Sequence, residues 1–360
     1  MTVDTVIAGL GIAGARLAGL LSKAGLKVKA FDPDISYRKP CGEAVPINEY
    51  TKYIVSKYTG YRALIRRFKV VVDERTIYEE EFSNPLWYII DKTRLVLSLR
   101  REAEDHGVEL SYTPFKRTLN GEKTLTVDAR GPFSRGSEGA VTVYRIIYRP
   151  QKQWPEDGIL VEFDTRKLGF YWIFPSNPWE NTVNAGGGFY ELPKQYLLLK
   201  TVDKYINKKT GIKEIHSKAA SLVRIKPKIK LWDDYSKSLN VGEAAGFLVS
   251  ITGEGIRPGL LSADYLAMAI LENLGDFNGI KEAYEEKAAG LVKETELSAR
   301  LFETVEKANI NERGRILSNV PKGFWRDYFK AKLTLPGIVL SALKEPSRGL
   351  RLLPYLFRLF

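Results

Sequence analysis

The feature that most constrains this chain is the segment GLGIAG at residues 9–14, which directly follows an apolar run. Residues 3–8, VDTVIA, predict a buried strand, and the following ARLAGLLSKAG predicts an amphipathic helix that ends at Gly25. KVKAFD then predicts a second strand, which ends at Asp32. A glycine-rich turn between a strand and a helix, with an acidic residue at the end of the next strand, is typical of a dinucleotide-binding βαβ unit.

Each part of this motif has a physical role. Gly9 permits the tight turn, Gly11 lets the backbone approach a pyrophosphate, and Gly14 lets helix and strand pack closely. The N-terminus of the helix presents free N–H groups and the positive end of the helix dipole to phosphates. Asp32 is placed to accept hydrogen bonds from the ribose hydroxyls of the adenosine half.

A second glycine-rich segment, residues 241–267, decides between the dinucleotides. Its sequence, VGEAAGFLVSITGEGIRPGLLSADYLA, places Glu243 at a predicted strand end and then a helix that we expect to start near Gly259. A second nucleotide-contacting element so far along the chain favours FAD, because the extended FAD molecule reaches beyond the first turn. The predicted FAD contacts in the two segments are Gly9, Gly11, Ile12, Ala13, Gly14 and Asp32, and Gly242, Glu243, Gly246, Gly253, Gly255 and Ile256.

The remaining pattern predicts an α/β chain in three parts. A Rossmann-like, GR-type FAD-binding domain is expected in pieces 1–65, 85–135 and 236–285. Residues 66–84 and 136–235 alternate as strands rich in aromatic residues, which predicts an inserted antiparallel β-sheet domain that binds the substrate. Residues 286–360 are expected to form a helical C-terminal segment that is both basic and apolar.

Composition excludes several kinds of site. A single cysteine, Cys41, rules out an intramolecular disulfide and a CxxC pair, and His106 and His216 are the only histidines, so no metal site is predicted. Both histidines are expected to be structural.

The net charge of +12 indicates attraction to polyanions, but no nucleic-acid-binding motif is present, so no nucleic-acid partner is predicted. No apolar run is long enough to span a bilayer, and cysteine usage indicates a reducing, cytoplasmic location.

Taken in order, several motifs resemble the geranylgeranyl reductase family, flavoproteins of the p-hydroxybenzoate hydroxylase superfamily. They are GLGIAG, KPCGE, the DKTRLVLSL helix, FYWIFP with GGGF, and GEAAG followed by TGEGIRPGLLSA. The resemblance covers roughly residues 1–290. It implies an FAD-dependent reductase that saturates C=C bonds of geranylgeranyl chains in membrane lipids or quinones, including the archaeal ether lipids. The sequence does not name the electron donor: it contains no second GxGxxG for a separate nicotinamide domain, so NADPH, a ferredoxin and a reduced quinone stay open.

The resemblance also implies roles for single residues. It places the loop of Pro40, Cys41 and Gly42 beside the flavin ring, and it matches Lys92 to the basic residue of the family's cofactor-binding helix. The chain departs from the family in three places: Glu243 replaces an aspartate, Phe170 replaces the first tyrosine of the Y-x-W-x-F-P motif, and Arg130 replaces an aspartate between alanine and glycine.

Reduction of an alkene by hydride transfer also needs a proton donor, for which Cys41 and Glu43 are the candidates. Two alternatives stay open for Cys41, since a free cysteine is often a buried filler and a thiol in this loop can simply shape the pocket. Phe170, Trp172 and Phe174 alternate along a predicted strand and share one face, which is either a channel for a prenyl chain or ordinary core. The predicted substrate-binding residues are Phe170, Trp172, Phe174, Gly187 and Phe189, and the dense glycines of AGGGF indicate close approach of the backbone to a ligand.

Two further hypotheses remain open on the sequence. One is a monooxygenase or halogenase that activates oxygen, although FYWIFP only partly matches the halogenase pattern. The other is a prenyl-lipid-binding flavoprotein without turnover. The aromatic and basic C-terminal tail predicts packing for some residues and contact with the inner face of a membrane for the last turn, including Phe357 and Phe360. Pro346 and Pro354 are expected to break the tail, so that it is not one helix.

Overall fold

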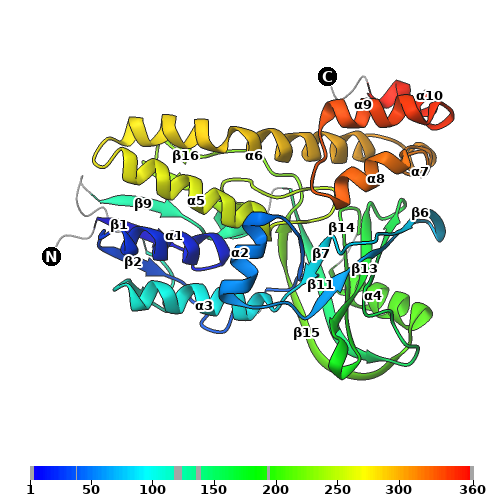
Figure 1. The fold of residues 1–360 in the computed structure, drawn as a ribbon, viewed down its shortest axis with the longest axis horizontal. Helices are drawn as coiled ribbons and strands as arrows, with labels where there is room; N and C mark the ends of the chain where they lie inside the picture. Colours follow the sequence, from blue (N-terminus) through cyan, green and yellow to red (C-terminus); the bar gives the residue numbers. More distant parts are fainter. Residues whose placement is uncertain (1–3, 38, 117–123, 135–138, 193–194, 357–360) are drawn as a thin grey trace. The chain divides into compact units, whose positions relative to one another are not determined.

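The computed structural model describes residues 4–37, 39–116, 124–134, 139–192 and 195–356 (Figure 1). The chain divides into two compact units, each built from three separate pieces of sequence. Unit 1 comprises residues 1–38, 92–140 and 224–299, and unit 2 comprises residues 39–91, 141–223 and 300–360. Each unit has its own sheet and its own set of covering helices.

Unit 1 begins with the predicted βαβ unit. Its strands are β1 (Thr5–Ala8), β2 (Val28–Phe31), β8 (Glu109–Ser111), β9 (Leu125–Asp128), β16 (Trp232–Asp233) and β17 (Ser238–Asn240). Its helices are α1 (Ile12–Lys23), α3 (Lys92–Asp105), α5 (Ile256–Glu272) and most of α6 (Phe277–Glu306), with two short 3₁₀ turns, η1 (Gly131–Phe133) and η3 (Gly242–Ala244).

The sheet of unit 1 has the strand order β16-β17-β9-β1-β2-β8, and all pairs except β16–β17 are parallel. Helix α1 packs against both α3 and α5, and nine of its twelve residues are buried. Even the charge on this helix is satisfied internally, because Arg16 pairs with Asp264 of α5 at 2.7 Å. The carboxyl ends of four neighbouring strands, β2, β1, β9 and β17, therefore meet at one edge of a well-covered sheet.

Unit 2 is built mainly from strands. They are β3 (Ala44–Pro46), β4 (Ala63–Ile65), β5 (Arg67–Val72), β6 (Arg75–Glu81), β7 (Trp87–Ile89), β11 (Ala140–Pro150), β12 (Gly158–Asp164), β13 (Gly169–Asn177), β14 (Thr182–Phe189) and β15 (Ile212–Arg224). Its helices are α2 (Glu49–Tyr58), α4 (Gln195–Lys209), α7 (Ile310–Ser318), α8 (Lys322–Phe329), α9 (Leu335–Lys344) and α10 (Pro346–Leu356), with a 3₁₀ turn η2 (Pro178–Glu180).

Seven of these strands form one sheet in the order β15-β11-β14-β13-β12-β5-β6, and β3, β7 and β4 form a small second sheet. Every pair whose register is described is antiparallel except β12–β5. Helix α4 covers one face of the large sheet with Leu198, Val202 and Ile206, which pack on Ile146, Ile173 and other buried side chains. The predicted fold class, an α/β chain with an antiparallel sheet in a second part, is confirmed by this topology.

The C-terminal segment packs on unit 2 through aromatic residues. Phe329 of α8 lies 4.4 Å from Phe68 and 5.8 Å from Tyr78, measured between ring centroids. Trp325, which is 2% exposed, lies 5.9 Å from Phe163 of β12, and the indole N–H of Trp87 donates to the carbonyl of Phe329 at 2.6 Å. Much of the predicted tail is therefore core. Phe357 and Phe360 lie outside the described residues. No helix in the described part of the chain combines the length and the apolar character needed to cross a bilayer.

The division into units differs from the predicted boundaries. Residues 39–65 and 85–91 belong to unit 2, where β3, β4 and β7 form the small second sheet. Residues 300–360 also belong to unit 2, where their aromatic side chains enter its core, so they are not a separate segment. Residues 286–299 of α6 remain with unit 1.

Three local expectations need correction. Residues 195–209 form α4, although only strands are predicted in that part of the chain. Helix α5 starts at Ile256, three residues before the expected Gly259. Pro346 does separate α9 from α10, but Pro354 lies inside α10. Because it has no N–H group, Pro354 removes one i→i−4 hydrogen bond from α10.

The first prediction concerns the aromatic anchor of the tail. Trp325→Ala is expected to lower the free energy of unfolding by about 3–5 kcal/mol, because it removes the largest side chain from a packed core. Thermal unfolding followed by circular dichroism measures the change. The control is Leu343→Ala, at a side chain that is 71% exposed, where the change should stay within about 0.5 kcal/mol. Equal effects of the two substitutions would contradict the packing described here.

Candidate functional site

The first glycine turn lies at the carboxyl end of β1. Gly9 has φ +102°, and a Cβ there would lie 2.4 Å from the carbonyl oxygen of Ala129, which follows β9. A Cβ on Gly14 would lie 1.9 Å from the carbonyl oxygen of Gly9. Both glycines are therefore required by the packing of α1 on the strand end, whether or not a ligand is bound.

Gly11 is different, because its place does not require a glycine for packing. A Cβ at this position would meet only the ring of Tyr37, at 3.6 Å. Gly11 is the N-cap residue of α1, and no side chain caps this helix end. The ammonium of Lys92, the buried first residue of α3, lies 5.5 Å from the centre of the Tyr37 ring. The uncapped N-terminus of α1 is thus bordered by an aromatic ring and a cation in unit 1.

Asp32 lies at the carboxyl end of β2, as predicted, and its carboxylate points at the glycine turn. Oδ2 accepts a hydrogen bond from the backbone N–H of Leu10 at 2.6 Å, and Oδ1 accepts one from Asp34 at 2.8 Å. Arg100 of α3, which is 2% exposed, lies behind the carboxylate, with Nη2 3.4 Å from Oδ2. The same guanidinium donates to the carbonyl oxygens of Leu10 and Asp34, so it fixes the turn and the strand end together.

The second glycine-rich segment converges on the same edge of the sheet. Gly242 has φ +63°, a Cβ there would lie 2.7 Å from the Cβ of Ala13, and its N–H donates to Ser262 of α5 at 3.0 Å. Glu243 accepts a hydrogen bond from the backbone N–H of Arg224 at 2.8 Å, and its Oε2 lies 3.8 Å from the Cβ position of Gly131. Unit 1 therefore brings three glycine turns, those after β1, β9 and β17, to one place.

Arg130 stands where the geranylgeranyl reductase family, which the chain resembles, has an aspartate, and its side chain is paired with a neighbouring carboxylate. Its guanidinium pairs with Asp128 at 2.7 Å, and the same carboxylate accepts its backbone N–H at 3.0 Å. This hydrogen bond, opposed by partial burial, raises the pKa of Arg130 above its ordinary value. The substitution therefore adds no uncompensated charge to this edge of the sheet.

The loop before α5 is fixed by two ion pairs of the buried Arg257. Gly253 has φ +71°, Gly255 is the N-cap residue of α5, and Val249 and Glu254 form an isolated antiparallel bridge. Arg257 pairs with Glu254 at 2.8 Å and with Glu294 of α6 at 2.5 Å. Burial disfavours the charge on Arg257, but the two carboxylates outweigh burial and raise its pKa above the ordinary value. Gly246 has a packing reason, since a Cβ there would lie 2.7 Å from the carbonyl oxygen of Lys228.

The loop that holds Cys41 belongs to unit 2 and is tied to its large sheet. The amide of Asn184, a fully buried residue of β14, donates to the carbonyl oxygen of Cys41 at 2.8 Å. The same amide accepts a hydrogen bond from the indole N–H of Trp172 at 3.0 Å. A Cβ on Gly42 would lie 2.6 Å from the ring of Phe174, so the loop rests directly on that ring. The loop is thus tied to Trp172 through Asn184 and lies directly against Phe174 at Gly42.

Glu43 closes this loop in an unusual conformation. It has φ +63°, a left-handed conformation that is uncommon for a residue with a side chain, and it is 4% exposed. Its carboxylate lies 3.6 Å from the guanidinium of Arg145 on β11, and its backbone carbonyl accepts the N–H of Ile90 at 2.9 Å. Unit 2 therefore holds the half-buried thiol of Cys41 and a buried carboxylate within one short loop.

The predicted substrate-binding residues are divided between the two faces of the large sheet. Phe170, Trp172 and Phe174 share one face as predicted, with 6.3 Å between the ring centroids of the first two. Phe189 lies on the other face, 4.8 Å from Tyr171, in the core beneath α4. A Cβ on Gly187 would also point to that side, 3.2 Å from Val202 of α4. Gly187 and Phe189 therefore lie on the opposite face from Phe170, Trp172 and Phe174, because neighbouring residues of a strand alternate between faces.

The triple glycine of β14 also has a packing explanation. A Cβ on Gly186 would lie 2.3 Å from the indole of Trp172, and one on Gly188 would lie 2.7 Å from Val143. The glycines therefore make room for side chains of the neighbouring strands β13 and β11. The interpretation that they allow the backbone to approach a ligand is not needed to explain them.

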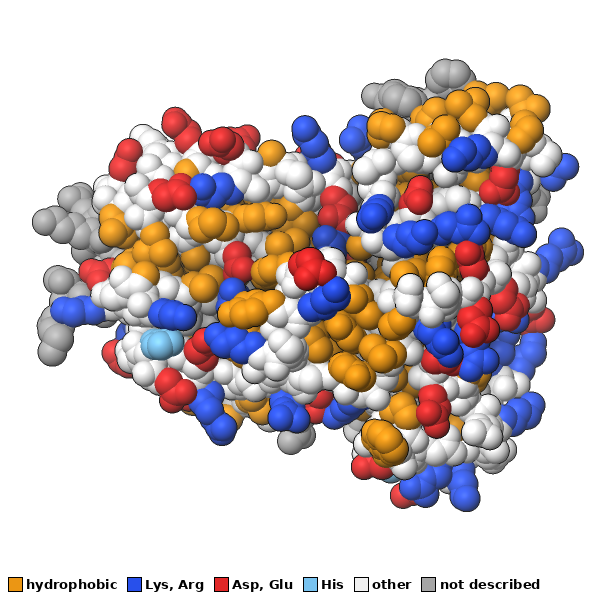
Figure 2. All heavy atoms as spheres, viewed as in Figure 1, with side chains coloured by type: hydrophobic (Ala, Val, Ile, Leu, Met, Phe, Trp, Pro, Cys, Tyr) orange, Lys and Arg blue, Asp and Glu red, His pale blue; other side chains and the backbone are white. Residues whose placement is uncertain are grey.

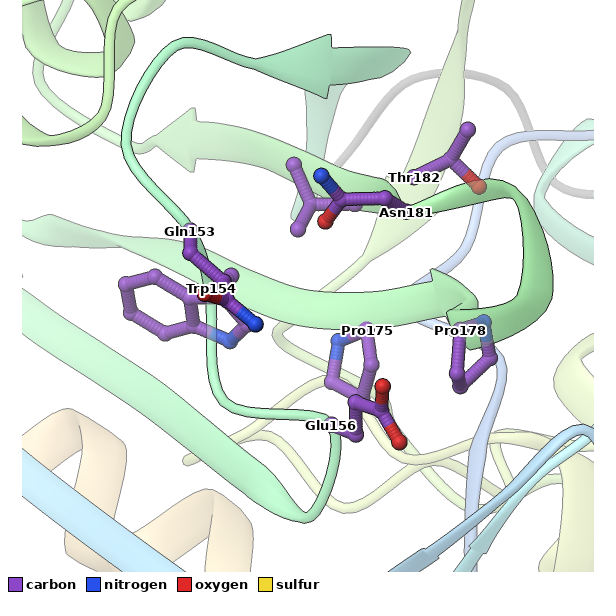
Figure 3. A pocket seen from close by; sticks show the side chains of 8 residues that line it. Gln153, Trp154, Glu156, Pro175, Pro178, Asn181 and Thr182 are labelled. Atoms are coloured by element: carbon purple, nitrogen blue, oxygen red, sulfur yellow. The ribbon is translucent and has the colours of Figure 1, made fainter.

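Unit 2 contains a cavity of about 330 Å³ at one end of β13 and β14 (Figure 3). Figure 3 shows Trp154 and Glu156 on the segment between β11 and β12, opposite Pro175 of β13 and Asn181 beside β14. The other lining residues are Gln153, Pro178, Thr182 and Val183. None of the predicted substrate-binding residues lines it.

Three residues that fix the candidate sites were not predicted from the sequence: Arg100, Arg145 and Asn184. Arg100 follows the apolar spacing of its helix and could have been noticed as a charge on a buried face, since Val96 and Leu99 share that face. No local pattern distinguishes Arg145 or Asn184. Within the described residues, no group of His, Cys, Asp and Glu is arranged to hold a metal ion.

Comparison with solved structures defines the class of fold. A geranylgeranyl bacteriochlorophyll reductase-like protein from Thermoplasma acidophilum matches with a TM-score of 0.76 at 16% identity, over 98% of both chains. The flavin-dependent brominase Bmp2 matches with a TM-score of 0.66 at 15% identity, over 96% of this chain and 98% of its own. CtdE, solved in complex with FAD, matches with a TM-score of 0.61 at 14% identity, over 86% of this chain and 91% of its own.

No family model matches the chain. The solved structures nevertheless extend over nearly the whole chain, so the chain has the two-part α/β fold that it shares with these three proteins. This likeness confirms the predicted fold.

The second prediction concerns the link between Asn184 and the Cys41 loop. Asn184→Ala is expected to raise the alkylation rate of Cys41 severalfold, because the carbonyl of Cys41 loses its buried donor and the loop opens more often. Mass spectrometry measures the rate without ambiguity, since Cys41 is the only cysteine. Asn207→Ala, at an exposed amide on α4, is the matched control and should leave the rate unchanged. An unchanged rate in Asn184→Ala would show that this hydrogen bond does not hold the loop.

Proposed function

We propose that this protein is an FAD-dependent oxidoreductase that reduces C=C bonds of isoprenoid chains in lipids or quinones. The observation that carries the cofactor assignment is the convergence of three glycine turns with Asp32 at the carboxyl edge of the unit 1 sheet. In open α/β sheets, ligands bind at this edge, where the strand order reverses around β1. The FAD complex of CtdE, which has the same fold, supports the choice of FAD over other dinucleotides.

The residues at this edge fit such a cofactor. A Cβ on Gly11 would make only an ordinary contact with the Tyr37 ring, and the N-terminus of α1 has no side-chain cap. These N–H groups would hold the pyrophosphate, and Asp32, oriented by Arg100, would accept hydrogen bonds from a ribose. Lys92 and the turn at Gly242 and Glu243 would contact the remaining polar groups of the cofactor.

The choice of reaction rests on two supports. The motifs KPCGE and FYWIFP with GGGF resemble the geranylgeranyl reductase family. The geranylgeranyl bacteriochlorophyll reductase-like protein matches over 98% of both chains, which includes the C-terminal helices.

Reduction of an alkene adds a hydride to one carbon and a proton to the other. When bound, the reduced flavin would supply the hydride. The proton would come from the Cys41 thiol or from the Glu43 carboxyl, and the loop that carries both is fixed by Asn184 and Phe174. Arg145 would orient the Glu43 carboxylate and stabilise its charge after proton donation.

A second candidate function is oxygen activation, as in a monooxygenase or halogenase. The observation that favours it is the fold shared with the brominase Bmp2 over 96% of this chain. The two candidates differ in what reoxidises the reduced flavin, so one experiment separates them.

The third prediction is the outcome of an anaerobic turnover experiment. The protein is loaded with FAD, reduced with dithionite in the absence of oxygen, and mixed with a geranylgeranyl lipid. We expect the flavin to be reoxidised, which is seen as the return of its absorption band. We also expect mass spectrometry to show a lipid product with one more saturated bond. Reoxidation by oxygen alone, with a hydroxylated product, would support the second candidate, and a protein that cannot be loaded with FAD would exclude both.

Two variants locate the proton donor in the same experiment. We expect either Cys41→Ser or Glu43→Gln to slow product formation at least tenfold while the rate of flavin reduction by dithionite is unchanged. If both variants turn over at the normal rate, the Cys41 loop is not the source of the proton.

The fourth prediction separates the glycines by role. Gly11→Ala should fold with normal thermal stability but bind FAD at least tenfold more weakly, because its Cβ has room in the free protein and would occupy the space of the pyrophosphate. Gly14→Ala is the contrasting variant, and it should unfold at a lower temperature without any ligand, since its Cβ would clash with Gly9. Fluorescence quenching on FAD titration and thermal unfolding measure the two effects. Normal FAD affinity in Gly11→Ala would place the cofactor elsewhere.

A further inference from the structure

The helices α9 and α10 leave a row of large apolar side chains uncovered. Leu340 and Leu343 of α9 are 52% and 71% exposed, and Leu350 and Leu353 of α10 are 66% and 41% exposed. Along α9, Pro336, Leu340 and Leu343 recur at a spacing that puts them on one side of the helix, and Leu350, Leu353 and Pro354 do the same on α10. Figure 2 shows hydrophobic side chains gathered over these two helices.

The opposite sides of both helices are already used for packing. Ile338 and Ala342 of α9 are buried, and Leu352 and Tyr355 of α10 pack with Ile316 of α7. Gly349 of α10 lies against the backbone of Ala342, where a Cβ would stand 2.3 Å from the carbonyl oxygen of Ala342, so the two helices cross in close contact. The leucines are therefore not exposed because the helices are loosely packed. They are the outer surface of a tightly packed helix pair.

The charges on this helix pair have one sign. From Lys322 to Leu356 the chain has seven Lys or Arg residues and only two acidic ones. Lys344 and Arg351 are exposed beside the leucines, and no described exposed position of α9 or α10 is acidic. The two acidic residues, Asp327 and Glu345, are half-buried, and Glu345 pairs with Arg348 on its own segment.

We propose that the outer face of α9 and α10 is a docking surface for an anionic lipid bilayer. Short helices with leucines on one side and Lys or Arg at the margins are typical of segments that lie in the membrane interface, where apolar side chains enter the acyl boundary and cations meet the headgroups. The surface provides both parts of this interaction on rigid helices. The proposal goes beyond the proposed reaction and rests on this surface alone.

A second copy of the chain fits this surface less well. In a two-fold symmetric dimer the same surface of each copy faces the other. A contact between the leucines of two copies would therefore bring the Lys344 and Arg351 side chains of both copies into one interface. Like charges at short distance oppose association. A bilayer that contains anionic lipids places opposite charges at these positions.

The fifth prediction is tested by sedimentation of the full chain with vesicles. The protein should bind vesicles in which anionic phosphatidylglycerol replaces part of the phosphatidylcholine, and it should bind phosphatidylcholine alone at least tenfold more weakly. Raising the salt from about 0.1 M to about 1 M, which shortens the Debye length from about 10 Å to about 3 Å, should release much of the bound protein.

Matched variants distinguish binding through this surface from non-specific binding through any exposed apolar side chain. Leu343→Ser with Leu350→Ser should lower the vesicle affinity at least tenfold and leave the thermal unfolding temperature unchanged, since both side chains are exposed. The control pair is Leu199→Ser with Leu274→Ser, two leucines exposed on other helices or loops, at 43% and 62%, and it should bind normally. Equal vesicle binding by both pairs would overturn the proposal. So would no vesicle binding by the unaltered protein, or a dimer in solution that the first pair dissociates.

Discussion

The structure of unit 1 depends on one close approach between backbone atoms. The first turn of α1 rests on the carbonyl oxygen of Gly9, and it can do so only because Gly14 has no Cβ. Gly9 in turn lies against the backbone after β9, where its positive φ turns the chain into the helix. This contact places the uncapped N-terminus of α1 beside the ends of β9 and β17, so that the later glycine turns join the first.

A comparable constraint organises the candidate site of unit 2. Asn184 is buried in the middle of a sheet, where an amide is costly unless both its donor and its acceptor are satisfied. The indole of Trp172 and the carbonyl of Cys41 satisfy them, and the chain thereby ties a loop near residue 41 to strands more than a hundred residues later. The loop gains a fixed position without a disulfide or a metal, and Glu43 is held in a left-handed conformation at its end.

The two sites explain why prediction from the sequence succeeded in unit 1 and was incomplete in unit 2. The glycine turns, the acidic residue at the end of β2 and the helix in the second glycine-rich segment can be recognised from short stretches of sequence, although Gly9 and Gly242 are also required by the distant residues Ala129 and Ala13. The sequence did not show that Phe189 and Gly187 lie on the opposite face from Phe170, because the face of each residue depends on which strand it pairs with and in which register. The missed helix α4 did carry a signal, since Leu198, Val202, Tyr205 and Ile206 recur at helical spacing.

The sequence by itself determined the βαβ unit, the second glycine-rich turn, the antiparallel aromatic sheet and the place of the single thiol in a short loop. These features follow from glycine stereochemistry and from the periodicity of apolar residues, which act within a few residues of chain. Only the tertiary structure decided that Arg100 lies behind Asp32, that Asn184 holds Cys41, and that four leucines of α9 and α10 remain uncovered. Such contacts join residues far apart in the chain, and burial depends on what the whole fold places over a side chain.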